Sequence, residues 1–406
     1  MPKRIDHRLQ RLALIGGGRW ARVLAGVLLD MTPATVQIAI HTASNATGMG
    51  DWSVRHGRNR VRVVTGWPEF HAGNRPDAVI VANAARDHAK AAGPALRAGI
   101  ATLVEKPLAL SERDARDLVE LARRHSALLA VSRVLLFAHS LERFASQVAA
   151  RAPTKCARID WTDPKIEMRH GEAKRYDASI PVWIDVLPHI LPILRALFGR
   201  DAEFAALTIS KGGAETELRM KVASLPCSIT LARNADTRRR MIDVEDTRGQ
   251  LRLDLSEGSG RILDRQEELD NHPMGTRSGP LAPMLRKFLE CAADGIADDR
   301  LSPATAIQDC RIADQILPVY RRKQAEWLAG RLQRQFDPDI RYALSELLYG
   351  VAPREPLEDA QIASIWDAIA NLGAGALIGI LVDPIRRDQE LRRLLARTAR
   401  SANVPN

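Results

Sequence analysis

The chain has 406 residues and a formal net charge of +10, with 27% charged and only 4% aromatic residues. This length exceeds one ordinary hydrophobic core and predicts two domains with an appendage. The basic residues are spread along amphipathic segments with few aromatic residues among them, so we expect no nucleic-acid partner. An anionic small molecule would suit the same charge.

Cysteine spacing and apolar run length give two further expectations. The four cysteines lie far apart and form no C-x-x-C pair, which argues against a metal site or a disulfide framework and favours a reducing cytoplasm. The first apolar run covers only Leu12 to Ile15, too short for a signal peptide. The longest later run, 372–382, is interrupted by glycines and is too short to span a membrane.

A glycine turn follows that first apolar run, and a segment with helical periodicity, 20–29, follows the turn. The pattern is G-x-G-x-x-A in strand–turn–helix context, which is typical of dinucleotide binding. A glycine allows the tight turn and close backbone approach to pyrophosphate, and the helix N-terminus attracts phosphate. A purely structural turn is the alternative. The residues expected at the dinucleotide are Gly16, Gly18, Arg19, Trp20 and Ala21.

The next predicted strand, 36–40, ends in His41-Thr42-Ala43-Ser44-Asn45 and carries no acid there. An acid at this place holds the ribose 2′-hydroxyl of NAD, whereas it would repel the 2′-phosphate of NADP. Hydroxyl donors at Thr42 and Ser44 therefore favour NADP, with NAD as the alternative. Alternatively, these residues form an ordinary polar loop, and the ribose is held elsewhere.

Further strands are predicted at 62–64, 78–81, 101–104 and 128–131, with helices between them. Alternating strands and helices of this size predict a doubly wound parallel sheet. Ser111 and Asp114 form an expected N-cap pair at the start of one helix.

The strand 101–104 leads into Glu105-Lys106-Pro107. The carboxyl ends of parallel strands face the ligand crevice in open α/β sheets, and a proline biases the preceding residue towards extended backbone. Lys106 can then direct its ammonium at a substrate oxygen and stabilise developing alkoxide charge. A single lysine after a strand is otherwise a solvated surface charge.

A later apolar segment, 180–198, carries Asp185 and His189 four residues apart. On a helix these residues share one face, so the carboxylate can orient the imidazole for proton transfer. A packed core histidine is the alternative. Pro188 and Pro192 predict a kink or a late start of the helix.

In order and spacing these pieces resemble the glucose-fructose oxidoreductase / inositol dehydrogenase / MocA family of NAD(P)-dependent oxidoreductases. The resemblance covers about the first three quarters of the chain. It implies a Rossmann domain and a second α/β domain with an open, mainly antiparallel sheet. It also implies Lys106, His189 and Asp185 as catalytic residues. The additional cofactor contacts implied are Asn83, His88, Glu105 and Lys106. Bulky residues before Asp185 and a proline at 192 depart from the family pattern, which leaves the substrate open.

The resemblance sets the expected domains at 1–133, 134–323 and 324–406. Strands are predicted at 203–209, 215–222, 227–232, 241–246 and 250–255, and helices at 280–293 and 302–320. The basic segment 163–179, which includes Tyr176, is expected to be a loop near the site. The tail, 324–406, should be a helical extension for self-association or partner docking, with helices at 324–336, 341–349, 359–381 and 383–402. Family sheets often pair between subunits, which predicts a homo-oligomer.

The function expected from these features is hydride transfer between NADP and a carbonyl or hydroxyl carbon of a sugar-like or other polar metabolite, which can carry an anionic group. Two alternatives stay open. One is a C=N reductase similar to thiazolinyl imine reductases, which tend to lack the motif lysine. The other is a non-catalytic NAD(P)-binding regulator, against which the intact Lys106, Asp185 and His189 argue.

Overall fold

The computed structural model describes residues 9–71, 73, 75–151, 153–169, 172–174, 180–273, 279–348 and 357–401. The chain divides into two compact units, here called the first and the second unit. The first unit contains Met1–Lys155, Leu187–Ala202 and Met241–Ala313, and the second contains Cys156–Val186, Glu203–Arg240 and Asp314–Asn406.

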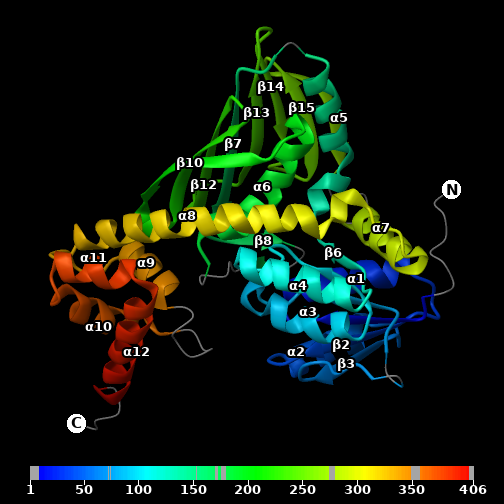
Figure 1. The fold of residues 1–406 in the computed structure, drawn as a ribbon, viewed down its shortest axis with the longest axis horizontal. Coiled ribbons are helices and arrows are strands. Elements are labelled where there is room, and N and C mark those ends of the chain that lie inside the picture. The colour runs from blue at the N-terminus through cyan, green and yellow to red at the C-terminus, as the bar shows by residue number, and fades with distance from the viewer. Residues whose placement is uncertain are drawn as a thin grey trace. The chain divides into compact units, whose positions relative to one another are not determined.

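The first unit contains a six-stranded sheet, which belongs to the blue and cyan part of the chain (Figure 1). Its strand order is β3-β2-β1-β4-β5-β6, and every neighbouring pair is parallel. Its strands are β1 (Arg11–Ile15), β2 (Gln37–Thr42), β3 (Val61–Thr65), β4 (Ala78–Val81), β5 (Ala101–Val104) and β6 (Leu129–Val131). The connecting helices are α1 (Arg19–Met31), α2 (Ala46–His56), α3 (His88–Arg97) and α4 (Glu112–Arg124). This confirms the predicted doubly wound sheet.

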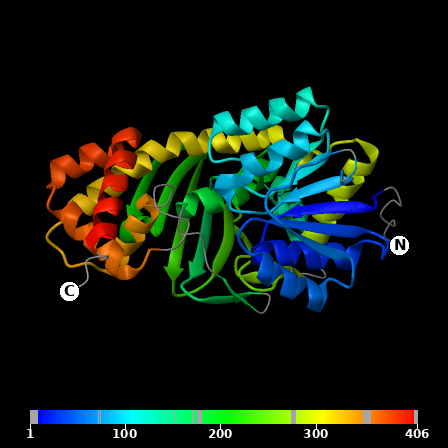
Figure 2. The same cartoon turned by 90° about the horizontal axis from the view of Figure 1, so that it is seen from below.

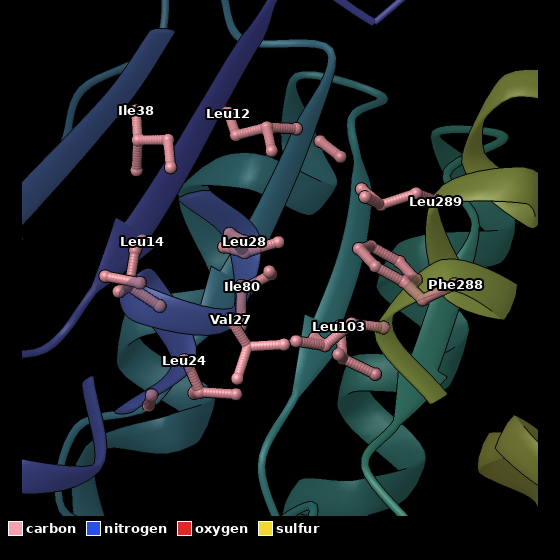
Figure 3. Close-up of a cluster of buried hydrophobic side chains, with 14 of the residues drawn as sticks. Leu12, Leu14, Leu24, Val27, Leu28, Ile38, Ile80, Leu103, Phe288 and Leu289 are labelled. Atoms are coloured by element: carbon pink, nitrogen blue, oxygen red, sulfur yellow. The ribbon is translucent and has the colours of Figure 1, made fainter. Parts of the chain in front are cut away.

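Both faces of this sheet are buried because successive residues of a strand point to opposite sides. Leu12 and Leu14 of β1 belong to a cluster that includes Leu24 and Leu28 of α1 (Figure 3). The same cluster contains Phe288 of α7 (Leu281–Asp294), which packs beside α1. Ala13 and Ile15 instead join the opposite cluster with residues of α3 and α4. The continuous apolar runs of the sequence therefore correspond to strands covered on two sides.

The predicted helix start at Ser111 is confirmed in the first unit. The Ser111 side chain accepts a hydrogen bond from the backbone N–H of Asp114, and its hydroxyl donates to the Asp114 carboxylate at 2.8 Å. Satisfying an exposed helix N–H in this way typically contributes about 1 kcal/mol.

The second sheet has eight strands in the order β10-β11-β12-β7-β13-β14-β15-β16. Its strands are β7 (Cys156–Pro164), β10 (Ala202–Ser210), β11 (Glu215–Val222), β12 (Leu225–Ala235), β13 (Arg239–Glu245), β14 (Gln250–Asp254), β15 (Ser259–Asp264) and β16 (Glu267–Pro273). β12 and β7 pair in parallel, whereas β11–β12, β13–β14, β14–β15 and β15–β16 are antiparallel. The mainly antiparallel sheet was expected, but β15 and β16 were not.

The expectation of a loop over 163–179 is wrong for its described part. β7 continues to Pro164, and β8 (Glu167–Arg169) pairs antiparallel with β9 (Glu172–Lys174). Strands of three residues in a charged segment show no apolar alternation, so the sequence carried no strand signal. Tyr176 lies outside the described residues.

Helix α6 (Val182–Phe198) runs through both Pro188 and Pro192. The helix begins six residues before the first proline, so the expected late start does not occur. Burial of apolar residues along the helix, including Trp183 and Ile190 at 0% exposure, offsets the two lost backbone donors.

The C-terminal region is helical, as predicted, with different boundaries (Figure 2). Its helices are α8 (Pro303–Ala329), α9 (Pro338–Leu348), α10 (Asp359–Ala370), α11 (Ala374–Val382) and α12 (Pro384–Ser401). α8 continues through the expected boundary after residue 323. The single helix expected over 359–381 is broken at Gly373, whose φ of 77° favours glycine.

These last helices share one apolar cluster, in which Leu328, Ile340, Trp366, Leu377 and Leu391 are buried. Among the described residues, no single helix has the length and composition of a membrane span. α10 and α11 pass such a test only as a pair bent by 115°.

Candidate active site

The carboxyl edge of the parallel sheet brings the predicted cofactor residues into register. Past the strand ends, Gly16 N donates to His41 O at 2.9 Å, and Ala82 N donates to Ile15 O at 2.8 Å. The next link along the sheet is Glu105 N to Val81 O at 2.9 Å. The glycine turn, the end of β4 and the Glu105-Lys106 segment therefore lie along one edge, where open α/β sheets bind ligands.

The three glycines of the turn have different reasons to be glycine. A Cβ on Gly16 would lie 2.6 Å from Ala82 O, and a Cβ on Gly17 would overlap the Thr42 hydroxyl. At Gly18, by contrast, no heavy atom of the described residues lies within 4 Å of the Cβ position. Gly16 and Gly17 thus serve the fold, and Gly18 leaves open space at the N-terminus of α1, where phosphate is favoured.

The two residues predicted to contact a 2′-phosphate, at and just after the end of β2, differ in exposure. Thr42 is 3% exposed, and its hydroxyl oxygen accepts from Asn45 N at 3.2 Å. Asn45 Nδ2 in turn donates to Gly17 O at 2.6 Å, so Thr42 and Asn45 brace the glycine turn. Ser44 is exposed beside them. The sequence reading did not recognise this bracing role, since Thr42 and Gly17 are far apart in the chain.

His88 also forms contacts within the protein. Its ring is 1% exposed, with Nδ1 2.7 Å from Pro107 O and Nε2 3.2 Å from Asn83 O. Burial lowers its pKa, although the two backbone carbonyls act in the opposite direction. The imidazole therefore joins the segment after β4 to the Lys106-Pro107 turn, whose peptide bond is cis.

Glu105 is the buried acid at this edge. It is 6% exposed, and burial raises its pKa, while hydrogen bonds from the Trp20 and Ser132 side chains oppose that rise. Within the described part of the chain, its Oε1 atom and both side-chain polar atoms of Asn83 have no hydrogen-bond partner. Buried polar atoms without partners are costly. Together with the space at Gly18, they provide the donors and acceptors that a bound dinucleotide would satisfy.

The predicted catalytic residues are placed as follows. Lys106 is half-buried directly after Glu105, and Asp185 and His189 lie one turn apart on α6. Lys106 and His189 belong to the first unit and Asp185 to the second. Whether Lys106 and His189 face one substrate oxygen stays a prediction.

Two arginine contacts of α6 were missed by sequence reasoning. Asp185 Oδ2 lies 3.4 Å from Arg233 Nη2, and Arg233 is 1% exposed. In the first unit, Arg195 of α6 and Arg133 both donate to Asp309, at 3.1 and 3.0 Å. The partners in these contacts come from segments that are distant in the sequence, so no local pattern predicts them. The one available signal for Arg233 was the presence of a charged residue in the mainly apolar strand segment around Leu231.

Residues 10–133 match the family described as an oxidoreductase family with an NAD-binding Rossmann fold, Gfo/Idh/MocA. The chain carries the NAD(P)-binding Rossmann domain of this oxidoreductase family in its N-terminal part. No curated protein matches it by sequence.

Solved structures share the wider fold at low identity. UDP-N-acetylglucosamine 3-dehydrogenase GnnA from Acidithiobacillus ferrooxidans has 18% identity and a TM-score of 0.62, covering 77% of this chain and 98% of its own. The 3-ketoreductase KijD10 from Actinomadura kijaniata, in complex with NADP and TDP-benzene, has 18% identity and a TM-score of 0.62, covering 76% and 96%. GenD2 from gentamicin A biosynthesis, in complex with NAD, has 19% identity and a TM-score of 0.62, covering 80% and 96%.

Gly18→Ala should separate cofactor binding from folding. The new methyl group meets open space in the protein but occupies the approach to a pyrophosphate, so NADPH affinity should fall about tenfold or more. The thermal unfolding midpoint without cofactor should stay unchanged. Gly16→Ala is the matched control, because its Cβ meets Ala82 O and should lower the midpoint. Fluorescence titration and thermal unfolding would measure both, and undiminished NADPH binding by Gly18→Ala would contradict the assignment.

Glu105→Gln should change how stability depends on pH. The raised pKa of Glu105 means that the folded state holds this proton to higher pH than the unfolded chain, where glutamate titrates near about 4.3. Stability from this group therefore decreases as pH rises from there through the folded pKa. Glutamine should remove that decrease and make the variant relatively more stable at neutral pH. Urea unfolding between pH 4 and 8 measures it, with exposed Glu69→Gln as control; parallel profiles would refute it.

Proposed function

We propose that the chain transfers a hydride between NADP and a carbonyl or hydroxyl carbon of a sugar-like substrate. The observation that carries the proposal is the placement of Glu105-Lys106 beside the glycine turn, on the binding edge of the sheet. Nicotinamide supplies the hydride chemistry when bound. The protein's part is to hold the dinucleotide, exclude water and move one proton at the substrate oxygen.

Each residue of the proposed site has a role that follows from its chemistry. The Lys106 ammonium stabilises negative charge on the substrate oxygen. His189 gives or takes the hydroxyl proton as the general acid or base. Asp185 orients the imidazole from one helical turn away. Glu105, buried and hydrogen-bonded by Trp20 and Ser132, fixes the turn that presents Lys106.

A nucleotide sugar is the proposed substrate class. GnnA is named for its action on UDP-N-acetylglucosamine, and KijD10 is a 3-ketoreductase crystallised with TDP-benzene. The net charge of +10 supports an anionic substrate of this kind. The Lys106 side chain supports C=O rather than C=N chemistry, because a cation suits developing negative charge on oxygen.

NADPH should bind more tightly than NADH, by about tenfold, since β2 ends without an acid that would repel a 2′-phosphate. Ser44 is the exposed hydroxyl at this end. Ser44→Asp should therefore weaken NADPH binding and spare NADH binding, whereas Ser44→Ala, which introduces no charge, should weaken NADPH binding less. Calorimetric titration of the unchanged protein and both variants with each cofactor gives the six affinities. Equal affinities for the two cofactors in the unchanged protein would reject the NADP assignment.

Removing the proton donor or the cation should slow turnover far more than it weakens cofactor binding. His189→Ala and Lys106→Ala should each lower kcat by about 100- to 10,000-fold, the usual contribution of general acid–base groups. Asp185→Asn should cost less, because the imidazole remains. The assay follows nicotinamide absorbance with UDP-N-acetylglucosamine and NADP⁺.

Two results would overturn this proposal. Near-native turnover by His189→Ala would remove the histidine from catalysis. NADPH binding without turnover across a panel of nucleotide sugars, free sugars and imines would instead favour a non-catalytic regulator.

A further inference from the structure

A buried arginine in the second unit connects the predicted catalytic helix to the C-terminal extension. Arg233 on β12 is 1% exposed. Its Nη1 donates to Ile180 O at 2.8 Å and to the Tyr342 hydroxyl at 3.4 Å, and its Nη2 lies 3.4 Å from Asp185 Oδ2. One guanidinium therefore contacts the start of α6, the predicted orienting acid and helix α9.

The network continues from Tyr342 to a buried carboxylate on the same helix. Tyr342 hydrogen-bonds Glu346, which is 2% exposed. Glu346 Oε2 also accepts from the Tyr320 hydroxyl at 2.6 Å and from Gln324 Nε2 at 3.0 Å, both on α8. Trp183, two residues before Asp185, packs edge-on against Tyr320 with ring centroids 5.8 Å apart. Asp185 and Glu346 are thus joined through Arg233 and Tyr342.

The turn between β10 and β11 is shaped to receive α8 and α9. A Cβ on Gly212 would lie 2.4 Å from Asp339 O on α9, and a Cβ on Gly213 would overlap the Tyr320 hydroxyl. Their φ angles, 67° and 105°, also favour glycine. The body of the second unit and its C-terminal helices therefore pack as one continuous structure.

The electrostatics keep Arg233 charged where it lies. Burial alone would lower its pKa, but Tyr342, Asp185 and Glu346 outweigh burial and raise the pKa of the guanidinium. Burial and Glu346 raise the pKa of the Tyr342 hydroxyl well above its usual value, so Tyr342 stays protonated. A buried ion network of this kind is often no more stabilising than apolar residues of the same volume. A contribution to the free energy of unfolding is therefore not a sufficient reason for the presence of this buried network.

We propose that Arg233, Tyr342 and Glu346 are positioning residues for Asp185, so that helix α9 of the C-terminal extension is part of the catalytic apparatus. Tyr342 and Glu346 hold the Arg233 guanidinium in place, and the guanidinium in turn holds the Asp185 carboxylate. Asp185 then presents a constant orientation to the next turn of α6, where His189 lies. This inference rests on the proposed function, in which Asp185 acts on His189.

The chain offers a matched pair of variants for the test. Tyr342→Phe removes the hydroxyl that contacts both Arg233 and Glu346, whereas Tyr320→Phe removes a hydroxyl that hydrogen-bonds Glu346 from α8. Both keep the ring, and both should lower the thermal midpoint by a similar small amount. The diagnostic signal is the ¹³Cε1 resonance of His189 in full-length, histidine-labelled protein, assigned by its loss in His189→Gln.

Tyr342→Phe should move the His189 resonance, and Tyr320→Phe should move it much less. In an Asp185→Asn background, Tyr342→Phe should leave the resonance where Asp185→Asn alone puts it, because the effect passes through the carboxylate. With UDP-N-acetylglucosamine as the probe, Tyr342→Phe should lower kcat about fivefold with little change in KM, because the substituted residue acts on the reacting proton only through Asp185.

The outcomes separate the two proposals. Equal resonance shifts in Tyr342→Phe and Tyr320→Phe, or a Tyr342→Phe shift that persists with Asp185→Asn, would overturn the positioning role. If Asp185→Asn leaves the His189 chemical shift unchanged, the proposed Asp185–His189 interaction is overturned, and the positioning role is overturned with it. The absence of turnover with UDP-N-acetylglucosamine would count against the substrate class and leave the resonance test decisive.

Discussion

Backbone pairing between parallel strands is the constraint on which the candidate dinucleotide site depends. The pairs Ile15–His41, Ile15–Val81 and Val81–Val104 align the carboxyl ends of four strands. Because the register is fixed by buried apolar residues on both faces, the polar residues that follow each strand must emerge along one edge. Gly18, Asn83 and Glu105 are brought together in this way, although none of them determines the pairing.

The sequence predicted those elements whose signal is local. Apolar runs followed by turns gave the parallel sheet, and Ser111 with Asp114 gave a helix start that the structure confirms. Strand β16 escaped prediction because its residues are polar and mostly exposed, so no alternation marks it. The break at Gly373 was missed for a related reason, since the apolar pattern continues across it. An apolar pattern therefore predicts only elements that have at least one buried face, and it does not mark a break inside an apolar segment.

Local sequence patterns did not predict the hydrogen bonds that join separate segments of the chain. Thr42 was assigned to a cofactor phosphate, yet its hydroxyl also braces the glycine turn through Asn45. His88 was assigned to the cofactor, yet its ring nitrogens face two backbone carbonyls. In both cases cofactor binding by the residue stays a prediction. The contacts that join different segments, from Asn45 to Gly17 and from His88 to Pro107, span 28 and 19 residues, and a single chain read in order does not reveal them.

The C-terminal extension shows how such contacts change a functional interpretation. Its sequence indicates only amphipathic helices, which suggests a separable docking module. In the structure, however, α8 passes through the expected boundary, and α9 contributes Tyr342 and Glu346 to the network around Arg233. A charge held at 1% exposure requires its partners, because leaving a buried ion unpaired costs far more than the pair gains. The strand that carries Arg233 and the helix that carries Tyr342 and Glu346 therefore depend on each other, and Asp185 contacts the guanidinium that joins them.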